Sequence, residues 1–571
     1  MKLNKYFLLL VMFFVIYSIV GSLIIKSDDH LSTTDAPNHA VFCLRDYQNT
    51  LEVFRDIDIN FLKNIQRLKD IFTKGVIYWP KFVYLTSFPL MYFSESTVAA
   101  LKITNVFYLF LLMVFSYLLT LKLGGKRNEG VWVASLMPLY PFISKSISSY
   151  GLDFPLTVSV VIFLYLLLKT EGFKNTFYSL LLGLILGIST LIKGQVLLFV
   201  SAPLLVYFIN SVIREIKGRK DLISIFVIFA NLVIFGIFSF QIGSLWWGGK
   251  LDEILLSFGE HVGSGIKHLE SYPQEAYGSL SYYFFYFKYL FLKGLGPLLM
   301  IITGAFCLRY IFVFKDKGKR ILLVWVLVPF FIFSVLLVVH QLRFIMPIVP
   351  AMGIMTVLGS RFRKNSLTFI LRFIMLSLAC FQLFLLFGGI NKGRFRSLFS
   401  FDGDMILNKD NPNASIAEYF INELKNNFSE DIYKVVIIRF ADIEDGPMGL
   451  QFWIENKGYQ HGVRLITHDI FDQWNAAYQW LSEEGKYMIL FIGNEEFNFD
   501  NKDLWDKNEI LKIGKQWMPR FEAFKNCSQT KELLDSILPV VKSNSNYVSS
   551  FSCEDYYYCE IYEYSNVQQS Y

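Results

Sequence analysis

Long apolar runs recur along this sequence of 571 residues, and charged segments separate them. A helix of about 20 apolar residues can cross the hydrocarbon core of a bilayer, and about eleven runs approach that length. We therefore predict an α-helical polytopic membrane protein. The runs lie near residues 6–25, 97–121, 128–147, 152–168, 175–191, 195–213, 221–245, 295–314, 321–339, 344–359 and 366–388.

The first run, residues 6–25, is predicted to remain as a membrane helix. Its apolar core is longer than that of a usual signal peptide, and no clear cleavage site of small residues follows it. The alternative interpretation is a cleaved signal peptide. Both interpretations place Asp35, which follows this run, outside.

The distribution of basic residues predicts how the chain is oriented. Cytoplasmic loops of membrane proteins are enriched in Lys and Arg, and four short loops of this chain each carry a basic cluster. With these loops inside, the N-terminus is also inside, and loops 27–96 and 246–290 and the tail beyond residue 390 are outside. The basic clusters are Lys122–Arg127, Arg214–Lys220, Lys315–Arg320 and Arg361–Lys364.

Composition agrees with this class of protein. Hydrophobic residues make up 54% of the chain and charged residues only 18%, whereas about a quarter of the residues of a soluble protein are charged. The net charge of +6 is explained by the inside loops, so we predict no nucleic-acid partner. The predicted location is the cell's inner or plasma membrane, crossed several times, with the active site facing outside.

The two ends of the chain differ in composition. Residues 1–395 form the predicted membrane module, and residues 396–571 are polar and read as a small extracytoplasmic α/β domain. Strands are predicted at Val435–Phe440 and Met488–Gly493, and helices near 414–426 and 474–484. This domain shows no glycine-rich phosphate loop, metal cluster or nucleophile motif.

The outer loop 27–96 carries structure of its own. Apolar residues recur at helical spacing over residues 50–73, which predicts an amphipathic helix. Beside a membrane it would lie in the interface, and the alternative is a helix packed on a soluble face. The aromatic run 76–84 suits the boundary between water and lipid. Pro80 prevents a simple helix from starting further back.

Ionisable side chains at the predicted outer membrane face are candidates for chemistry. Asp153 follows Ser-Ser-Tyr-Gly, Lys193 lies in a turn between two runs, and Arg343 precedes Phe-Ile-Met-Pro-Ile-Val-Pro. Charges near membrane depth are costly and are commonly functional. The alternatives are that Asp153 caps a helix N-terminus, that Lys193 extends to the membrane surface, and that Arg343 anchors a helix end. The two prolines after Arg343 predict a broken helix.

These charges fit glycosyl transfer from a polyprenyl-phosphate sugar. A carboxylate must take the proton of the acceptor hydroxyl, and cations must offset the charge of the departing phosphate. We predict that Asp35 is the base and that Asp153 orients the acceptor or supports Asp35. Cations for the donor phosphate are Lys193, Arg343 and Lys81, and expected substrate contacts are His39, Tyr84 and His261.

No cofactor is predicted. His261 and His268 lie seven residues apart, which places them two turns apart on one helix face, but spacing indicates no third ligand. A divalent metal is therefore not indicated, and metal dependence is left open.

The order of these features resembles the membrane-embedded C-type superfamily of glycosyltransferases. Shared features are a cytoplasmic N-terminus, one helix, a long outer loop that opens on an aspartate motif, and closely connected helices. The chain is most similar to the branch that holds protein O-mannosyltransferases and the aminoarabinose transferase of lipid A. The resemblance covers roughly residues 1–390.

Five motifs carry the resemblance, and two of them depart from the family pattern. In Asp35-Ala-Pro-Asn-His, Asp35 matches the catalytic aspartate, but Ala36 replaces the usual Glu. In Pro80-Lys-Phe-Val-Tyr, Lys81 replaces a second proline, and Trp79 stands where some members have a phosphate-contacting lysine. The other three motifs surround Asp153, Lys193 and Arg343.

The resemblance implies an inverting glycosyltransferase, of the hexosyl or pentosyl type, that is similar to mannosyltransferases. It would use a polyprenyl-phosphate-linked sugar in membrane lipid and an acceptor that is a glycan, a lipid or a protein. Two alternatives remain open. One is a lipid or sugar transporter or flippase without transferase activity. The other is a receptor or assembly protein whose tail is the active part.

Overall fold

The structure is a computed structural model, and its description covers most of the chain up to residue 387 and parts of the tail. The described residues are 5–26, 36–56, 61–73, 80–94, 96–217, 222–247, 280–314, 318–336, 342–387, 412–427, 434–439, 449–456, 463–467, 485–494, 545–553 and 557–566.

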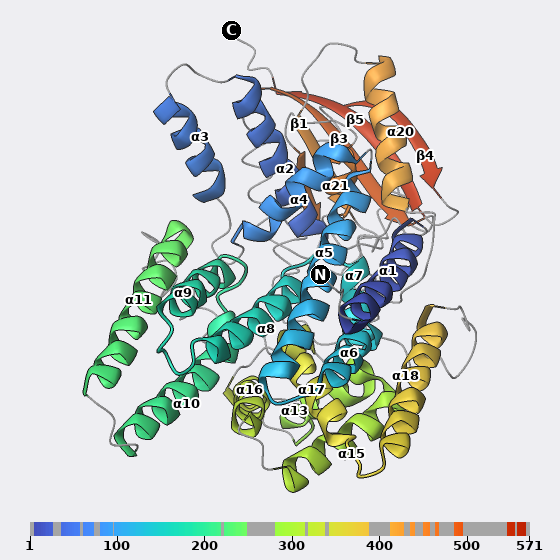
Figure 1. Ribbon diagram of the computed structural model, residues 1–571. Coiled ribbons are helices and arrows are strands. Elements are labelled where there is room, and N and C mark those ends of the chain that lie inside the picture. Colours follow the sequence, from blue (N-terminus) through green and yellow to red (C-terminus); the bar gives the residue numbers. More distant parts are fainter. Residues whose placement is uncertain are drawn as a thin grey trace. The chain divides into compact units, whose positions relative to one another are not determined.

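The chain divides into two compact units. The first contains residues 1–28, 45–265 and 276–407, and the second contains residues 29–44, 266–275 and 408–571. The first unit is a helical bundle (Figure 1). Its main helices are α1 (Lys5–Lys26), α5 (Thr97–Lys122), α6 (Arg127–Leu136), α7 (Pro141–Ser148), α8 (Asp153–Lys169), α9 (Thr176–Thr190), α10 (Val196–Lys217), α11 (Leu222–Trp247), α15 (Pro297–Val313), α16 (Lys319–Phe331), α17 (Val349–Gly359) and α18 (Asn365–Phe387).

Wherever their residues are described, the apolar runs predicted from sequence fall on helical structure. Six helical segments of the described part are long and apolar enough to cross a membrane, which makes this an integral multi-pass membrane protein. They are Lys5–Leu23, Thr97–Lys122, Val196–Lys217, Leu222–Trp247, Leu342–Gly359 and Asn365–Leu383. The total of eleven spans stays a prediction.

The run at 128–147 is not one continuous helix. It is divided into α6, a short 3-10 helix at Met137–Leu139 (η1), and α7. Pro138 and Pro141 lie at the two boundaries. A proline has no backbone N–H and its ring crowds the preceding turn, so it disfavours a helix interior, and the two prolines account for the division.

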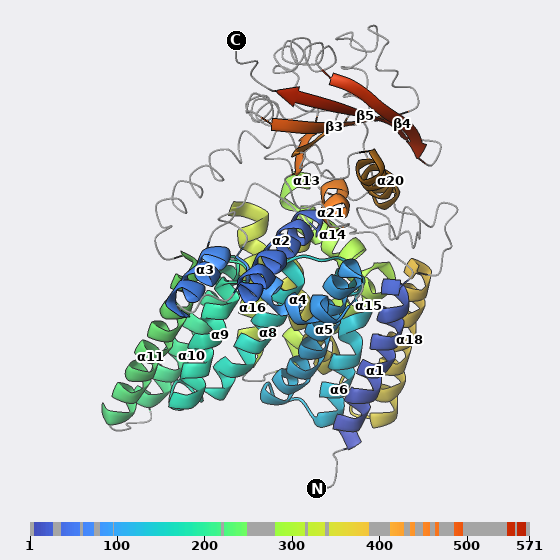
Figure 2. The same cartoon turned by 90° about the horizontal axis from the view of Figure 1, so that it is seen from above.

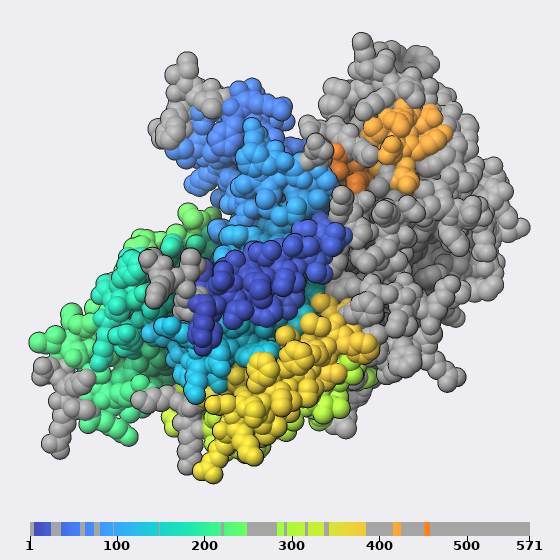
Figure 3. Space-filling model, turned by 45° about the vertical axis from the view of Figure 1, so that its right-hand side comes forward, coloured from blue at the N-terminus to red at the C-terminus, as the bar shows by residue number. Residues whose placement is uncertain are grey.

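The bundle has a packed interior and an apolar exterior. Most of α8 is buried, and α8 packs against α5. Helices α9, α10 and α11 lie side by side (Figure 2). Apolar side chains on α1 and α18 are exposed, among them Leu8, Leu23, Phe369 and Phe373. Both helices, dark blue and yellow, are visible at the front of Figure 3. Exposed apolar helix faces suit contact with lipid tails.

A buried ion cluster joins three parts of the bundle. Glu129, in the first turn of α6, is bound by Arg361 at 2.5 Å and by Arg372 at 3.0 Å. Arg372 also donates to the hydroxyl of Ser360 at 2.8 Å. The guanidinium groups satisfy both carboxylate oxygens, so this cluster fixes α6 against the turn between α17 and α18.

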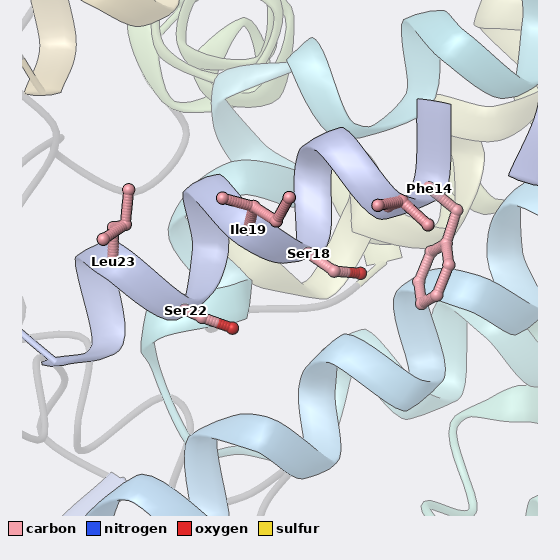
Figure 4. Close-up of a pocket in the computed structure, with 6 residues that line it drawn as sticks. Phe14, Ser18, Ile19, Ser22 and Leu23 are labelled. Atoms are coloured by element: carbon pink, nitrogen blue, oxygen red, sulfur yellow. The ribbon is translucent and has the colours of Figure 1, made fainter. Parts of the chain in front are cut away.

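A groove on the surface of α1 is shown in Figure 4. Its volume is 370 Å³. It is lined by Phe14, Val15, Ser18, Ile19, Ser22 and Leu23, none of which carries a charge.

The predicted loop 27–96 folds into three helices, α2 (Ala36–Arg55), α3 (Phe61–Thr73) and α4 (Phe82–Phe93). The single amphipathic helix predicted over residues 50–73 is therefore wrong. Helix α2 ends at Arg55, and α3 is a separate element that begins at Phe61. The sequence between them holds Asp58 and Asn60, which are weak helix formers. Helix α4 begins at Phe82, two residues after Pro80.

The broken helix predicted after Arg343 is confirmed. Residues Leu342–Ile348 form a 3-10 helix (η4) that contains Pro347, and α17 begins at Val349 with Pro350 in its first turn. The tight 3-10 turn places Arg343 at the start of this segment.

The second unit contains a five-stranded mixed sheet with the strand order β2-β1-β3-β5-β4. Strand β1 pairs in parallel with β2 and β3, and β5 is antiparallel to β3 and β4. Helices α20 (Pro412–Asn427) and α21 (Gly449–Asn456) lie on one face of the sheet (Figure 2). The strands are β1 (Lys434–Arg439), β2 (Val463–Thr467), β3 (Gly485–Asn494), β4 (Ser545–Cys553) and β5 (Tyr557–Asn566).

Secondary structure in this unit agrees with three of the four elements predicted from sequence. The strands predicted at Val435–Phe440 and Met488–Gly493 correspond to β1 and β3, and the helix predicted near 414–426 corresponds to α20. The helix predicted near 474–484 lies outside the described residues.

Candidate functional site

Three residues singled out from the sequence lie together in the helical unit. The ammonium nitrogen Nζ of Lys193 is 2.6 Å from Oδ1 of Asp153, and Nε of Arg343 is 3.7 Å from Oδ2. The Asp153 and Lys193 side chains are only 12% and 16% exposed, and that of Arg343 is 26% exposed. One carboxylate is therefore shared by two cations in a partly desolvated site.

Local structure explains where the first two of these groups sit. Asp153 is the first residue of α8, where a carboxylate is favoured by the helix dipole. Lys193 lies in the turn between α9 and α10; its amide donates to the carbonyl of Ser189 at 3.0 Å, and its carbonyl accepts from the amide of Val196 at 3.1 Å. Both backbones are held by hydrogen bonds, so the pairing depends little on flexible loops.

An aromatic ring supports both cations. Nζ of Lys193 is 5.0 Å from the ring centroid of Phe344, and Cζ of Arg343 is 5.7 Å from it. A cation over an aromatic face is attracted by the ring's quadrupole. Phe344 was not singled out from the sequence.

The segment that leads into Asp153 is anchored by buried polar side chains of α4 and α5. The amide nitrogen Nδ2 of Asn105 on α5 donates to the carbonyls of Ser149 at 2.8 Å and Ser146 at 3.0 Å. The hydroxyls of Tyr150 and Ser87 are 2.9 Å apart. Asn105 and Ser87 are fully buried, and they fix the position of the turn that precedes Asp153.

A second lysine–aspartate pair involves Lys81. Its Nζ donates to Oδ1 of Asp46 on α2 and to the backbone carbonyl of Ile71 on α3, both at 2.7 Å. Burial raises the pKa of the Asp46 carboxyl to about 6, although Lys81 acts to lower it. One ammonium group thus connects α2 and α3 to the start of α4.

A backbone hydrogen bond joins the two lysine–aspartate pairs. The amide of Phe82 donates to the carbonyl of Leu191 at 3.3 Å. Phe82 follows Lys81 directly, and Leu191 is two residues before Lys193. The five residues Asp46, Lys81, Asp153, Lys193 and Arg343 are called the charge cluster below.

Other residues predicted to act at the site have different outcomes. Asp35 and His261 lie outside the described residues. His39 lies on α2 and is 4% exposed. Tyr84 lies on α4, is 1% exposed, and has its ring centroid 6.5 Å from that of Tyr150. Tyr84 is therefore packed in the bundle interior, next to Tyr150 of the segment that precedes Asp153.

Four residues of interest were missed by the reasoning from sequence. Asp46, Phe344 and Asn105 show no local signal, because their roles depend on partners that are distant in sequence. Lys102 does show one: it interrupts the apolar run 97–121, and it is fully buried on α5. An ionisable residue inside a predicted span is a candidate for function.

The described part of the chain also bears on metal binding. No group of three or more His, Cys, Asp or Glu side chains in that part of the chain is arranged to hold a metal ion. The pair His261 and His268 lies outside it. The absence of a cofactor stays a prediction, and metal dependence stays open.

Comparison with solved structures identifies the fold. The crystal structure of ArnT from Cupriavidus metallidurans bound to undecaprenyl phosphate matches with a TM-score of 0.54 and 11% identity, over 98% of each chain. The apo form of the same protein matches with a TM-score of 0.51 and 12% identity, over 96% of this chain and 97% of that one. No protein-family model and no curated protein matches the sequence.

This likeness extends over nearly the whole length of both proteins. The chain therefore has the fold of these ArnT structures, and the resemblance to membrane glycosyltransferases predicted from sequence is confirmed at the level of the fold.

Proposed function

We propose that this protein is an inverting glycosyltransferase that moves a sugar from a polyprenyl-phosphate donor to an acceptor nucleophile. The observation that carries the proposal is the binding of Asp153 by Lys193 and Arg343. The positive charges of Lys193 and Arg343 are suited to binding an anionic lipid phosphate. The fold supports the same conclusion, because the ArnT structure that it matches is bound to undecaprenyl phosphate.

The cations would stabilise the leaving group. When the bond between sugar and phosphate breaks, negative charge develops on the phosphate oxygens, and positioned donors lower the energy of that state. The planar guanidinium group of Arg343 can donate hydrogen bonds to two phosphate oxygens, and the ammonium group of Lys193 supplies a second positive charge. Lys81, held beside Asp46, is the third cation proposed to bind the donor phosphate.

The two aspartates would have different roles. Asp35 is the proposed base that takes the proton of the acceptor hydroxyl, so that a single displacement inverts the anomeric carbon. Both oxygens of Asp153 face cations. Such a carboxylate is suited to positioning other groups rather than to accepting a proton. Asp153 would orient the acceptor or support Asp35.

The substrates are proposed by class. The donor carries a hexose or a pentose, and the acceptor is a glycan, a lipid or a protein. The reaction would take place on the outer face of the inner or plasma membrane, as the positive-inside pattern of the loops predicts. We propose no cofactor.

The test is transfer or release of sugar from a radiolabelled polyprenyl-phosphate sugar by membranes that contain the protein. Wild type is compared with Asp35→Asn and Asp153→Asn, at equal abundance. Asp70→Asn is the matched control, because Asp70 is an aspartate of the same loop that accepts from Gln66 at an exposed position.

Loss of turnover in Asp35→Asn, with normal turnover in Asp70→Asn, would support the proposal. Equal turnover in Asp35→Asn and wild type would show that Asp35 is not the base. If wild type acts on no donor from a panel of hexose and pentose carriers, the transferase proposal fails, and lipid transport is tested next.

A further inference from the structure

Lys81 makes two hydrogen bonds within the described part of the chain and has the capacity for three. An ammonium group carries three N–H donors. One goes to Oδ1 of Asp46 and one to the carbonyl of Ile71. The Lys81 side chain is 10% exposed. One donor therefore remains for a ligand such as a phosphate oxygen.

Asp46 acts on Lys81 at close range. Its side chain is 8% exposed, and its second oxygen, Oδ2, is buried and has no hydrogen-bond partner among the described residues. In such surroundings a carboxylate is poorly screened by water, so its charge strongly opposes the field of the neighbouring ammonium. An anion that approached Lys81 would meet a nearly neutral pair.

The whole charge cluster is balanced in the same way. Lys81 and Lys193 each have an aspartate at hydrogen-bond distance, and Arg343 is the third cation. With three cations and two carboxylates, the ionised cluster has a net charge of +1. Two of the three positive charges are therefore compensated before any ligand binds.

The charge of the lipid phosphate changes during the proposed reaction. The donor is a phosphodiester and carries one negative charge. The product is a phosphate monoester, which carries between about 1.5 and 2 negative charges at neutral pH. A site of uncompensated cations would hold the product more tightly than the donor and would slow its release.

We propose that Asp46 is a positioning residue that holds Lys81 in place and compensates its charge, so that the lipid phosphate monoester can leave the site. This inference rests on the proposed function. It assigns to Asp46 a role in product release, and it assigns no bond-making step to that residue.

The experiment measures binding of a short-chain polyprenyl monophosphate to the purified full-length protein in lipid nanodiscs. We expect Asp46→Asn to bind it about tenfold more tightly than wild type, because a compensating charge close to the phosphate is removed. Asp46→Glu keeps the charge and should bind as wild type does. Lys81→Met should bind more weakly, and the double variant Asp46→Asn with Lys81→Met should bind no more tightly than wild type.

Asp70→Asn serves again as the matched control and should leave binding unchanged. Thermal unfolding of every variant shows whether it is folded, and Asp46→Ser replaces Asp46→Asn if the latter does not fold. In steady-state transfer assays, Asp46→Asn should lower kcat and KM together, since slow product release limits turnover without weakening donor binding. A purely structural role would instead raise KM or reduce the amount of folded protein.

Weaker or unchanged binding of the monophosphate by folded Asp46→Asn would overturn the inference and leave the proposed function intact. Tighter binding that persists in the double variant would also overturn it, because the gain would not come from Lys81. If the wild-type protein binds no polyprenyl monophosphate, both the inference and the proposed function fail.

Discussion

Lys193 and Asp153 form an ion pair with a nitrogen–oxygen distance of 2.6 Å, although they are 40 residues apart in sequence. The pair joins the turn between α9 and α10 to the first residue of α8. Both groups are mostly buried, and a second cation, Arg343, lies on the other oxygen of the same carboxylate. Variants that disturb this arrangement are expected to have the largest effects on activity.

Lys193→Met should reduce kcat/KM for the polyprenyl-phosphate sugar by about 10- to 100-fold, since a charge-assisted hydrogen bond contributes about 1.5–3 kcal/mol. Lys193→Arg keeps the charge and should retain part of the activity. The measurement is steady-state transfer in membranes with matched protein levels.

The control for this variant is Lys174→Met. Lys174 precedes α9 and pairs at 2.6 Å with Glu215, which lies near the end of α10. This pair is therefore at the ends of the two helices that are away from Lys193. Its loss should lower the thermal stability and leave the activity per folded molecule unchanged. Equal effects of Lys193→Met and Lys174→Met on kcat/KM would show that the Lys193 pair is only structural.

Phe344→Leu should raise the KM for the donor by about 3- to 30-fold, because removal of the aromatic face costs the two cations about 0.5–2 kcal/mol of attraction. The leucine keeps the site apolar, so stability should change little. Donor titration of the transfer rate provides the measurement.

Phe369→Leu is the matched control, because this aromatic residue of α18 is 58% exposed on the outside of the bundle. It should behave as wild type. An unchanged KM in Phe344→Leu would mean that the ring does not support the cations.

Asn105→Leu should destabilise the protein by about 1–3 kcal/mol, because it removes the Nδ2 donor from two partly buried backbone carbonyls. Activity should fall as well, since the turn before Asp153 loses its anchor. Thermal unfolding in detergent measures the first effect, and transfer assays below the unfolding temperature measure the second. Full activity of the folded variant would show that this anchor is dispensable for placing Asp153.

The stability of wild type relative to Asp46→Asn should fall as the pH rises from about 4 to 6. The pKa of Asp46 is raised from 3.8 to about 6, so in this window the folded protein binds more protons than the unfolded chain. Stability due to the neutral carboxyl is complete below pH 3.8 and is lost above pH 6. The full difference is about 3 kcal/mol, at about 1.4 kcal/mol per pH unit.

The measurement compares unfolding temperatures of the two proteins across this pH range. Asp70→Asn is run beside them and should follow wild type. A difference between wild type and Asp46→Asn that does not change with pH would contradict the raised pKa.

The sequence by itself was sufficient to predict where most of the apolar helices lie and the membrane class, because apolar length is a local property of the chain. It also indicated Asp153, Lys193 and Arg343, since charged residues beside apolar runs are costly and therefore conspicuous. The break after Arg343 and the strands β1 and β3 were predictable for similar local reasons, namely two prolines and short apolar runs. Lys102 was visible in the same way and was overlooked.

Only the tertiary structure decided which charges meet. Asp46 lies among other polar residues of α2, and nothing local in the sequence relates it to Lys81, 35 residues later. The burial of Tyr84 also depends on neighbours from other elements, such as Tyr150. Pairing, burial and compensation of charge arise from packing between distant segments, whereas the pattern of apolar and polar residues records only what each segment requires locally.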